Sequence, residues 1–121
     1  MDIEAFQKYC LSLPGVEETF PFGPDTLVYK VMGKVFAITG LDEVDFQVNL
    51  KCDPERALEL RDEYQGRIIS GWHMNKKHWN TIYFESGLPH SLLIDLINHS
   101  YQLVVDSLPA KVRTQLKSIN G

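Results

Sequence analysis

The most constraining feature of the sequence is a pair of strand-like runs separated by only two residues. Residues 26–31 and 34–39 are rich in β-branched and aromatic side chains, and Met32-Gly33 lies between them. Because two residues are a typical length for a tight hairpin turn, the runs are expected to pair as antiparallel strands. Residues 46–51 alternate between apolar and polar side chains, which predicts a third, half-buried strand. The chain is therefore expected to contain a three-stranded meander.

Helix signals surround this meander. Asp2 and Asp53 each precede apolar residues at helical spacing, and a carboxylate in this position can accept hydrogen bonds from the first turn of a helix. Pro54 strengthens the second signal, because proline fits the first helical position. A broad apolar stripe over residues 89–108 predicts the longest helix, and Pro109 separates it from a short terminal helix.

Two further strands and a loop complete the predicted element order. Residues 67–71 are a short strand candidate and residues 80–84 a stronger one, joined by a turn that Asn75 can cap. Residues 16–25 contain three chain breakers, so they are predicted to form an ordered loop that carries two phenylalanines. The sequence thus predicts a single α+β domain over residues 1–121, with an antiparallel sheet packed by helices.

Length and composition are those of an ordinary globular domain. With 121 residues the chain can bury enough surface to fold without a metal or a disulfide, and 44% of its residues are hydrophobic. Cys10 and Cys52 are expected to be small buried thiols. No apolar run reaches the roughly 18 residues of a membrane span, and the N-terminus lacks the pattern of a signal peptide. We therefore expect a cytoplasmic protein with no membrane partner.

Residues 71–84 hold both tryptophans, two of the four histidines and the only Lys-Lys pair. Residues 65–83 contain no acidic side chain, whereas Arg67, Lys76 and Lys77 are cationic. Cations neutralise phosphates and aromatic faces stack on exposed bases, so this stretch has the chemistry of a nucleic-acid surface. The net charge of −4 argues against a protein held on nucleic acid by its total charge, so any attraction is local.

Structural explanations exist for the same residues. Tryptophans are common core anchors, and adjacent lysines are often simply solvated. For Lys76 and Lys77 both interpretations stay open. Trp79 directly precedes a predicted strand and can pack under the turn that Asn75 caps, so it is expected to be an internal anchor rather than an exposed stacking residue.

Metal and catalytic sites are not expected. His73 and His78 are five residues apart, about 140° around a helix, whereas a shared helix face requires a spacing of four, so only a turn could join them at one metal. No cysteine or acidic residue of their segment completes a ligand set. His90, Ser91 and Asp95 include the residue types of a hydrolase triad but lack a nucleophile elbow. No glycine-rich phosphate loop occurs, so no cofactor is expected.

Residues 72–81, Trp-His-Met-Asn-Lys-Lys-His-Trp-Asn-Thr, resemble the signature of the MmcQ/YjbR-like proteins, which are small bacterial domains. Residues 9–18 and Phe36-Ala37 also resemble the pattern of that family, so the resemblance spans the whole chain. It implies an α-β3-α-β2-α order, similar to that of secretion chaperones, and a described double-wing DNA-binding motif. It implies no catalytic residues and no cofactor.

The residues and the resemblance together favour a non-enzymatic binding module whose ligand is DNA. The expected contacts come from one segment and a preceding arginine: Arg67, Trp72, His73, Asn75, Lys76, Lys77 and His78. Trp79 is the expected structural anchor. An alternative is an adaptor that binds a protein or peptide through the sheet face or the hairpin edge, as a monomer or weak dimer. A more remote alternative is a small-molecule enzyme built on His73 and His78.

Overall fold

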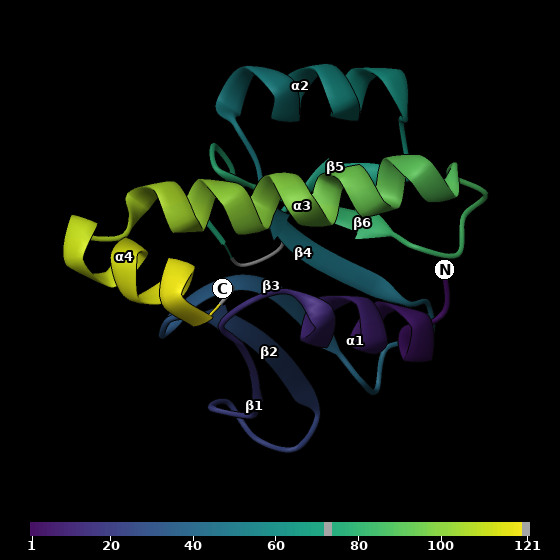
Figure 1. Cartoon of the computed structure of the whole chain (residues 1–121). Coiled ribbons are helices and arrows are strands. Elements are labelled where there is room, and N and C mark those ends of the chain that lie inside the picture. Colours follow the sequence, from purple (N-terminus) through teal and green to yellow (C-terminus); the bar gives the residue numbers. More distant parts are fainter. Residues whose placement is uncertain (72–73, 120–121) are drawn as a thin grey trace.

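The chain folds into one antiparallel sheet with helices on one of its faces (Figure 1). The computed structural model describes residues 1–71 and 74–119. The six strands of this part follow the order β1-β2-β3-β4-β6-β5. The elements are α1 (Ile3–Ser12), β1 (Val16–Thr19), β2 (Thr26–Val31), β3 (Lys34–Gly40), β4 (Gln47–Lys51), α2 (Pro54–Glu63), β5 (Ile68–Ser70), β6 (Trp79–Tyr83), α3 (His90–Ser107) and α4 (Ala110–Ile119). Among these helices, none is both long and apolar enough to cross a membrane.

Side-chain caps explain where the first two helices begin. The Asp2 carboxylate accepts a hydrogen bond from the Ala5 N–H at 2.8 Å, at the start of α1. The Asp53 carboxylate accepts from the Arg56 N–H at 3.2 Å, and Pro54 occupies the first position of α2. These bonds satisfy N–H groups that have no partner inside the helix. Both predicted helix starts are confirmed.

The β2–β3 hairpin combines a tight turn with a bulge. Met32 and Gly33 have φ angles of 48° and 84°, the left-handed pair that a two-residue hairpin turn requires. Farther from the turn, Lys30 pairs with Val35 but Tyr29 pairs with Ala37, so Phe36 is an extra residue on β3. Phe36 is fully buried like Ala37. The bulge therefore directs two consecutive side chains of β3 into the core.

A buried serine joins the longest helix to the middle of the sheet. Ser100 of α3 is fully buried, and its hydroxyl donates to the Phe36 carbonyl on β3 at 2.6 Å. The same oxygen accepts from the Lys51 N–H on β4 at 2.9 Å. The direct pairing of β3 with β4 covers two positions, Ala37 with Leu50 and Ile38 with Asn49. The serine hydroxyl thus bridges the two strands where their direct pairing ends.

The core is centred on aromatic contacts of α1. The Phe6 ring meets those of Tyr29, Phe46 and Phe84 edge to face, with centroid distances of 5.6, 5.7 and 5.5 Å. This geometry is favoured because the positive edge of one ring approaches the negative face of another. Residues from each of the four described helices belong to the same buried cluster, including Leu116 of α4. The helices therefore pack on a common face of the sheet, where α1 and α3 lie in Figure 1.

The element order differs from the expected α-β3-α-β2-α. The sequence predicts a loop over residues 16–25, but Val16–Thr19 form β1, an edge strand paired with β2. The chain breakers follow this strand, and the Tyr29 hydroxyl donates to the Glu18 carboxylate at 2.8 Å, which attaches the acidic strand to its neighbour. The short terminal helix is present as α4, so the order is α-β4-α-β2-α-α. The expected single α+β domain with an antiparallel sheet is confirmed.

Replacing Ser100 by alanine should lower the free energy of unfolding by about 2–4 kcal/mol, because two buried backbone groups lose their partner. Ser107→Ala is the matched control: it lies on the same helix, is exposed, and bonds only to the Val104 carbonyl of its own turn. That variant should change stability by no more than about 0.5 kcal/mol. Urea denaturation of both variants measures the difference, and equal losses would show that the bridge contributes little.

Candidate nucleic-acid interface

The segment rich in lysine and tryptophan forms a tight turn that leads into β6. The Asn75 side-chain carbonyl accepts from the Lys77 N–H at 3.0 Å. The Asn75 backbone carbonyl accepts from the N–H groups of His78 and Trp79 at 3.1 and 3.0 Å. Asparagine readily bonds to the backbone two residues ahead, which explains its place at the start of the turn. The predicted cap is confirmed, and we name residues 75–79 the lysine turn.

Two other elements hold the lysine turn in place. The Cys52 N–H, just after β4, donates to the His78 carbonyl at 2.8 Å. Arg61 of α2 donates to the Lys76 carbonyl and, through Nε, to the Asn80 side-chain carbonyl at 2.7 Å. The backbone of the turn is therefore attached both to the sheet and to α2.

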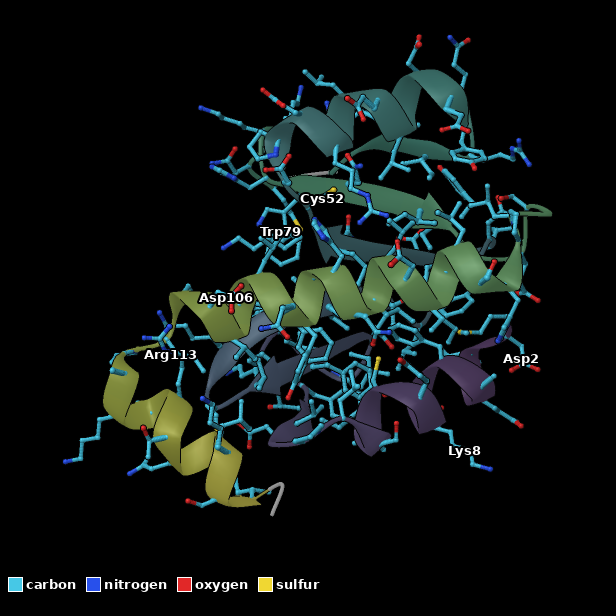
Figure 2. The ribbon with its side chains drawn as sticks, turned by 45° about the horizontal axis from the view of Figure 1, so that its top comes forward. Asp2, Lys8, Cys52, Trp79, Asp106 and Arg113 are labelled. Atoms are coloured by element: carbon cyan, nitrogen blue, oxygen red, sulfur yellow. The ribbon has the colours of Figure 1, made fainter. Side chains whose placement is uncertain are left out.

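Trp79, which the sequence predicts to be an internal anchor, is half-buried. It pairs with Lys51 of β4, and its carbonyl accepts from the Gly71 N–H at 2.9 Å. A Cβ on Gly71 would lie only 2.9 Å from the Trp79 Cβ, so a glycine permits this close approach. Figure 2 shows Trp79 near Cys52, at the end of the sheet that carries the lysine turn. Alternation along β6 explains the partial exposure, since Ile82 of the same strand faces the core and Trp79 has the opposite orientation.

Lys76 and Lys77 are exposed and line a hollow of about 350 Å³ between the turn and α2. Glu55, Leu58 and Arg61 of α2 line the same hollow. The fold thus brings a carboxylate next to a segment that has none in the sequence. In the part of the chain that the structure describes, neither lysine forms an ion pair. Their ammonium groups are therefore available to an external anion.

Arg67 lies apart from the lysine turn. It precedes β5, its carbonyl accepts from the Tyr83 N–H at 3.0 Å, and its guanidinium carbon lies 5.5 Å from the centre of the Tyr64 ring. Tyr83 and Trp79 are the two ends of β6, roughly 13 Å apart at the usual rise per residue. Arg67 and the lysines therefore mark opposite ends of the β5–β6 hairpin.

Of the expected contact residues, the fold gathers residues 75–78 in one turn and places Arg67 elsewhere. Trp72 and His73 lie outside the described residues. Sequence reasoning missed Arg61, which fixes the turn. Nothing along α2 distinguishes it from Arg56, because both resemble solvated charges on a polar helix, and only the packing of α2 against β6 reveals its role.

Two sets of potentially reactive side chains are Cys52, beside the turn, and His90, Ser91 and Asp95 of α3. Burial raises the pKa of the Cys52 thiol to about 11, so this thiol stays protonated and unreactive at neutral pH. Asp95 pairs with Arg56, while His90 and Ser91 are exposed at the start of α3. Among the described residues, no three His, Cys, Asp or Glu side chains are grouped so that they could hold a metal ion.

His99 joins α3 to the beginning of α2. Its Nε2 accepts a hydrogen bond from the Asp53 N–H at 3.1 Å, so this nitrogen carries no proton. Burial and then the nearby Arg56 guanidinium lower the pKa of His99, and the carboxylates of Asp95 and Asp53 oppose this effect. Protonation would remove the acceptor and add a positive charge near Arg56. The junction between α2 and α3 therefore favours the neutral histidine.

Comparisons with known proteins give a consistent family assignment. The family model YjbR matches residues 11–103. The chain is 41% identical over 115 residues to uncharacterized protein YbdF of Escherichia coli O157:H7, covering 94% of this chain and 93% of that protein. It is 34% identical over 116 residues to uncharacterized protein YjbR of E. coli strain K12, covering 96% and 98%. The crystal structure of Deinococcus radiodurans protein DR2400, with family-model domain DUF419, superposes with a TM-score of 0.89 at 37% identity, covering 95% of this chain and 87% of that one.

Acidification should destabilise the protein through His99. Its pKa is lower in the folded than in the unfolded chain, so the unfolded chain binds more protons near its ordinary pKa of about 6.5. The resulting stability is fully present above that pH and is lost as the pH falls toward the folded value. Urea unfolding at several pH values between neutrality and mild acid measures this loss.

His99→Gln is the matched variant, because the glutamine carbonyl can accept the Asp53 N–H without titrating. Its stability should fall less than that of the wild type over the same pH range. Parallel curves for the two proteins would contradict a role of His99 in the pH dependence.

Proposed function

This chain belongs to the YjbR family, and we propose that it is a non-enzymatic DNA-binding module whose segment 72–79 contacts phosphates. The observation that supports this function is the lysine turn, where two adjacent exposed lysines stand on a backbone held by Asn75, Cys52 and Arg61. An ammonium group acts as a point charge toward phosphate oxygens and does not require one bonding geometry. A fixed backbone beneath the lysines reduces the freedom that is lost on binding.

The negative net charge of the chain is compatible with such a contact. Exposed charges more than about 8 Å apart are largely screened from each other at physiological ionic strength. Glu55 lines the hollow beside the lysines, but the stretch of residues 65–83 contributes no acidic side chain of its own. The charges near the turn, rather than the total of −4, therefore decide whether a phosphate is attracted.

Replacing Lys76 and Lys77 by alanine should weaken binding to all duplex sequences alike, because phosphate contacts position a protein without reading bases. Each lost contact should flatten the plot of log affinity against log salt by about 0.9. Fluorescence anisotropy of a labelled duplex, titrated at several salt concentrations, measures both effects.

The matched control is Lys111→Ala/Lys117→Ala, which removes two exposed lysines from α4. This control should keep the salt slope of the wild type. The proposal is wrong if the wild type shows no salt-dependent binding, or if the control loses as much slope as the turn variant.

Two adjoining loops favour a second candidate function, an adaptor that binds a protein. Phe20 and Phe22 in the β1–β2 loop are 45% and 70% exposed, and Leu41 and Val44 in the β3–β4 loop are 41% and 100% exposed. The Leu41 N–H donates to the Asp25 carbonyl at 2.7 Å, which joins the two loops. Exposed apolar side chains gathered in one region are typical of protein interaction sites.

The variant Phe22→Ser/Val44→Ser should change stability by no more than about 0.5 kcal/mol, because both side chains are exposed. If the loops bind a protein, this variant should lose a partner that the wild type captures from a nuclease-treated lysate. Leu58→Ser changes an apolar residue of α2 that is 63% exposed and should retain the partner. Equal capture by all three proteins would argue against the adaptor.

A further inference from the structure

The face of the sheet opposite the core carries no helix in the described part of the chain (Figure 1). Val48 and Ile82, for example, enter the core. Because side chains alternate along a strand, the residues next to them lie on the opposite face. The register aligns one residue of every strand in a row across this face: Thr19, Val28, Ile38, Asn49, Thr81 and Ile69. We name this surface the open face.

Two aromatic side chains flank the row on β6. Trp79 and Tyr83 share the orientation of Thr81, and each is half-buried. Thr81 itself is fully buried, and its hydroxyl donates to the Asn49 side-chain carbonyl at 2.5 Å. The open face thus presents two partly exposed aromatic groups, with a small hydrogen-bonded residue between them. Aromatic side chains on a sheet surface are a recurrent platform for unpaired bases.

Each aromatic residue has a cationic neighbour. Lys51 of β4 pairs directly with Trp79. Arg67 precedes β5 and its carbonyl accepts from the Tyr83 N–H, while its guanidinium carbon lies 5.5 Å from the centre of the Tyr64 ring. On the described strands, the register assigns only one carboxylate to the open face, that of Glu17 on edge strand β1. Lys30 of β2 lies directly opposite Glu17. Lys51 and Arg67 are therefore not neutralised by a strand carboxylate next to them.

We propose that single-stranded nucleic acid crosses the open face, with bases stacked on Trp79 and Tyr83 and phosphates at Lys51 and Arg67. This inference rests on the proposed function and extends it, because Trp79 is both the first residue of β6 and the last of the lysine turn. At the other end of β6, Asp45 and Glu85 line a hollow together with Tyr83. Their carboxylates repel phosphate, so the path starts at the lysine turn, ends at Tyr83 and has no phosphate contact beyond Arg67.

The chemistry of the open face selects a single strand over a duplex. Bases in a duplex are stacked on one another, so their faces cannot reach side chains that are themselves half-buried in a sheet. An unpaired strand can place bases on both rings of β6 while its backbone follows the adjacent cations. Stacking tolerates any base, so little sequence preference is expected.

Anisotropy titrations with labelled oligo(dT), oligo(rU) and a DNA duplex of equal length test the inference. The wild type should bind at least one of the single strands more tightly than the duplex, and comparison of the two single strands shows whether the sugar matters. Tyr83→Leu and Trp79→Leu keep apolar side chains in the strand but remove the stacking face. Each should weaken single-strand binding by about tenfold or more, the loss for one stacked base.

Tyr83→Phe should retain single-strand binding, because its ring still stacks. Lys51→Gln and Arg67→Gln should each flatten the salt slope on oligo(dT) by about 0.7. Lys8 is an exposed lysine of α1, on the helix-covered side, so Lys8→Gln should leave the salt slope unchanged. The two charge variants keep the test decisive if a leucine variant does not fold.

The outcomes separate this inference from the proposed function. Duplex binding that depends on Lys76 and Lys77, with no preference for a single strand, would overturn the inference and leave the proposed function standing. Single-strand binding that is insensitive to the Trp79, Tyr83, Lys51 and Arg67 variants would also overturn it. Absence of binding to every nucleic acid would overturn both.

Discussion

The Ser100 hydroxyl of α3 lies between the Phe36 carbonyl of β3 and the Lys51 N–H of β4, in the buried centre of the molecule. Either backbone group would cost about 1–3 kcal/mol if it were left without a partner away from water. One side chain satisfies both, so the position of α3 and the separation of the two strands are set together. The bulge on β3 is part of this arrangement, because it lies beside the carbonyl that the serine contacts.

The same arrangement extends to the candidate interface through consecutive backbone groups. The N–H groups of Lys51, Cys52 and Asp53 donate in turn to Ser100, the His78 carbonyl and His99. The Cys52 bond therefore leads to the lysine turn, and the Lys51 and Asp53 bonds lead to α3. The turn proposed to contact phosphate is thus attached to the stretch of chain that also bonds to the buried Ser100, although its lysine side chains are exposed. Exposed ammonium groups above a hydrogen-bonded backbone suit contact with phosphate groups.

Part of the candidate interface could be predicted from the sequence. The sequence predicts that Asn75 caps a turn, and its side-chain carbonyl does accept from the N–H of Lys77, two residues ahead. Arg61 and Glu55 could not be found in this way, because they approach the turn from a helix that precedes it in the chain. The sequence predicts Trp79 as an internal anchor, and alternation along β6 places it on the face opposite the core, where it is half-buried.

Those parts of the structure whose interactions are local could be predicted from the amino-acid sequence alone. Asp2 and Asp53 cap helices that follow them directly, and the Met32-Gly33 turn brings two adjacent runs together, so each signal and its partner are only a few residues apart. Features that depend on distant residues follow only from the way the folded chain packs. Val16–Thr19 is a strand because β2 offers it an edge, and the bridge at Ser100 exists because a helix near the end of the chain crosses two strands from its first half. Burial and pairing depend on which groups meet after folding, and a pattern read along the chain does not contain that information.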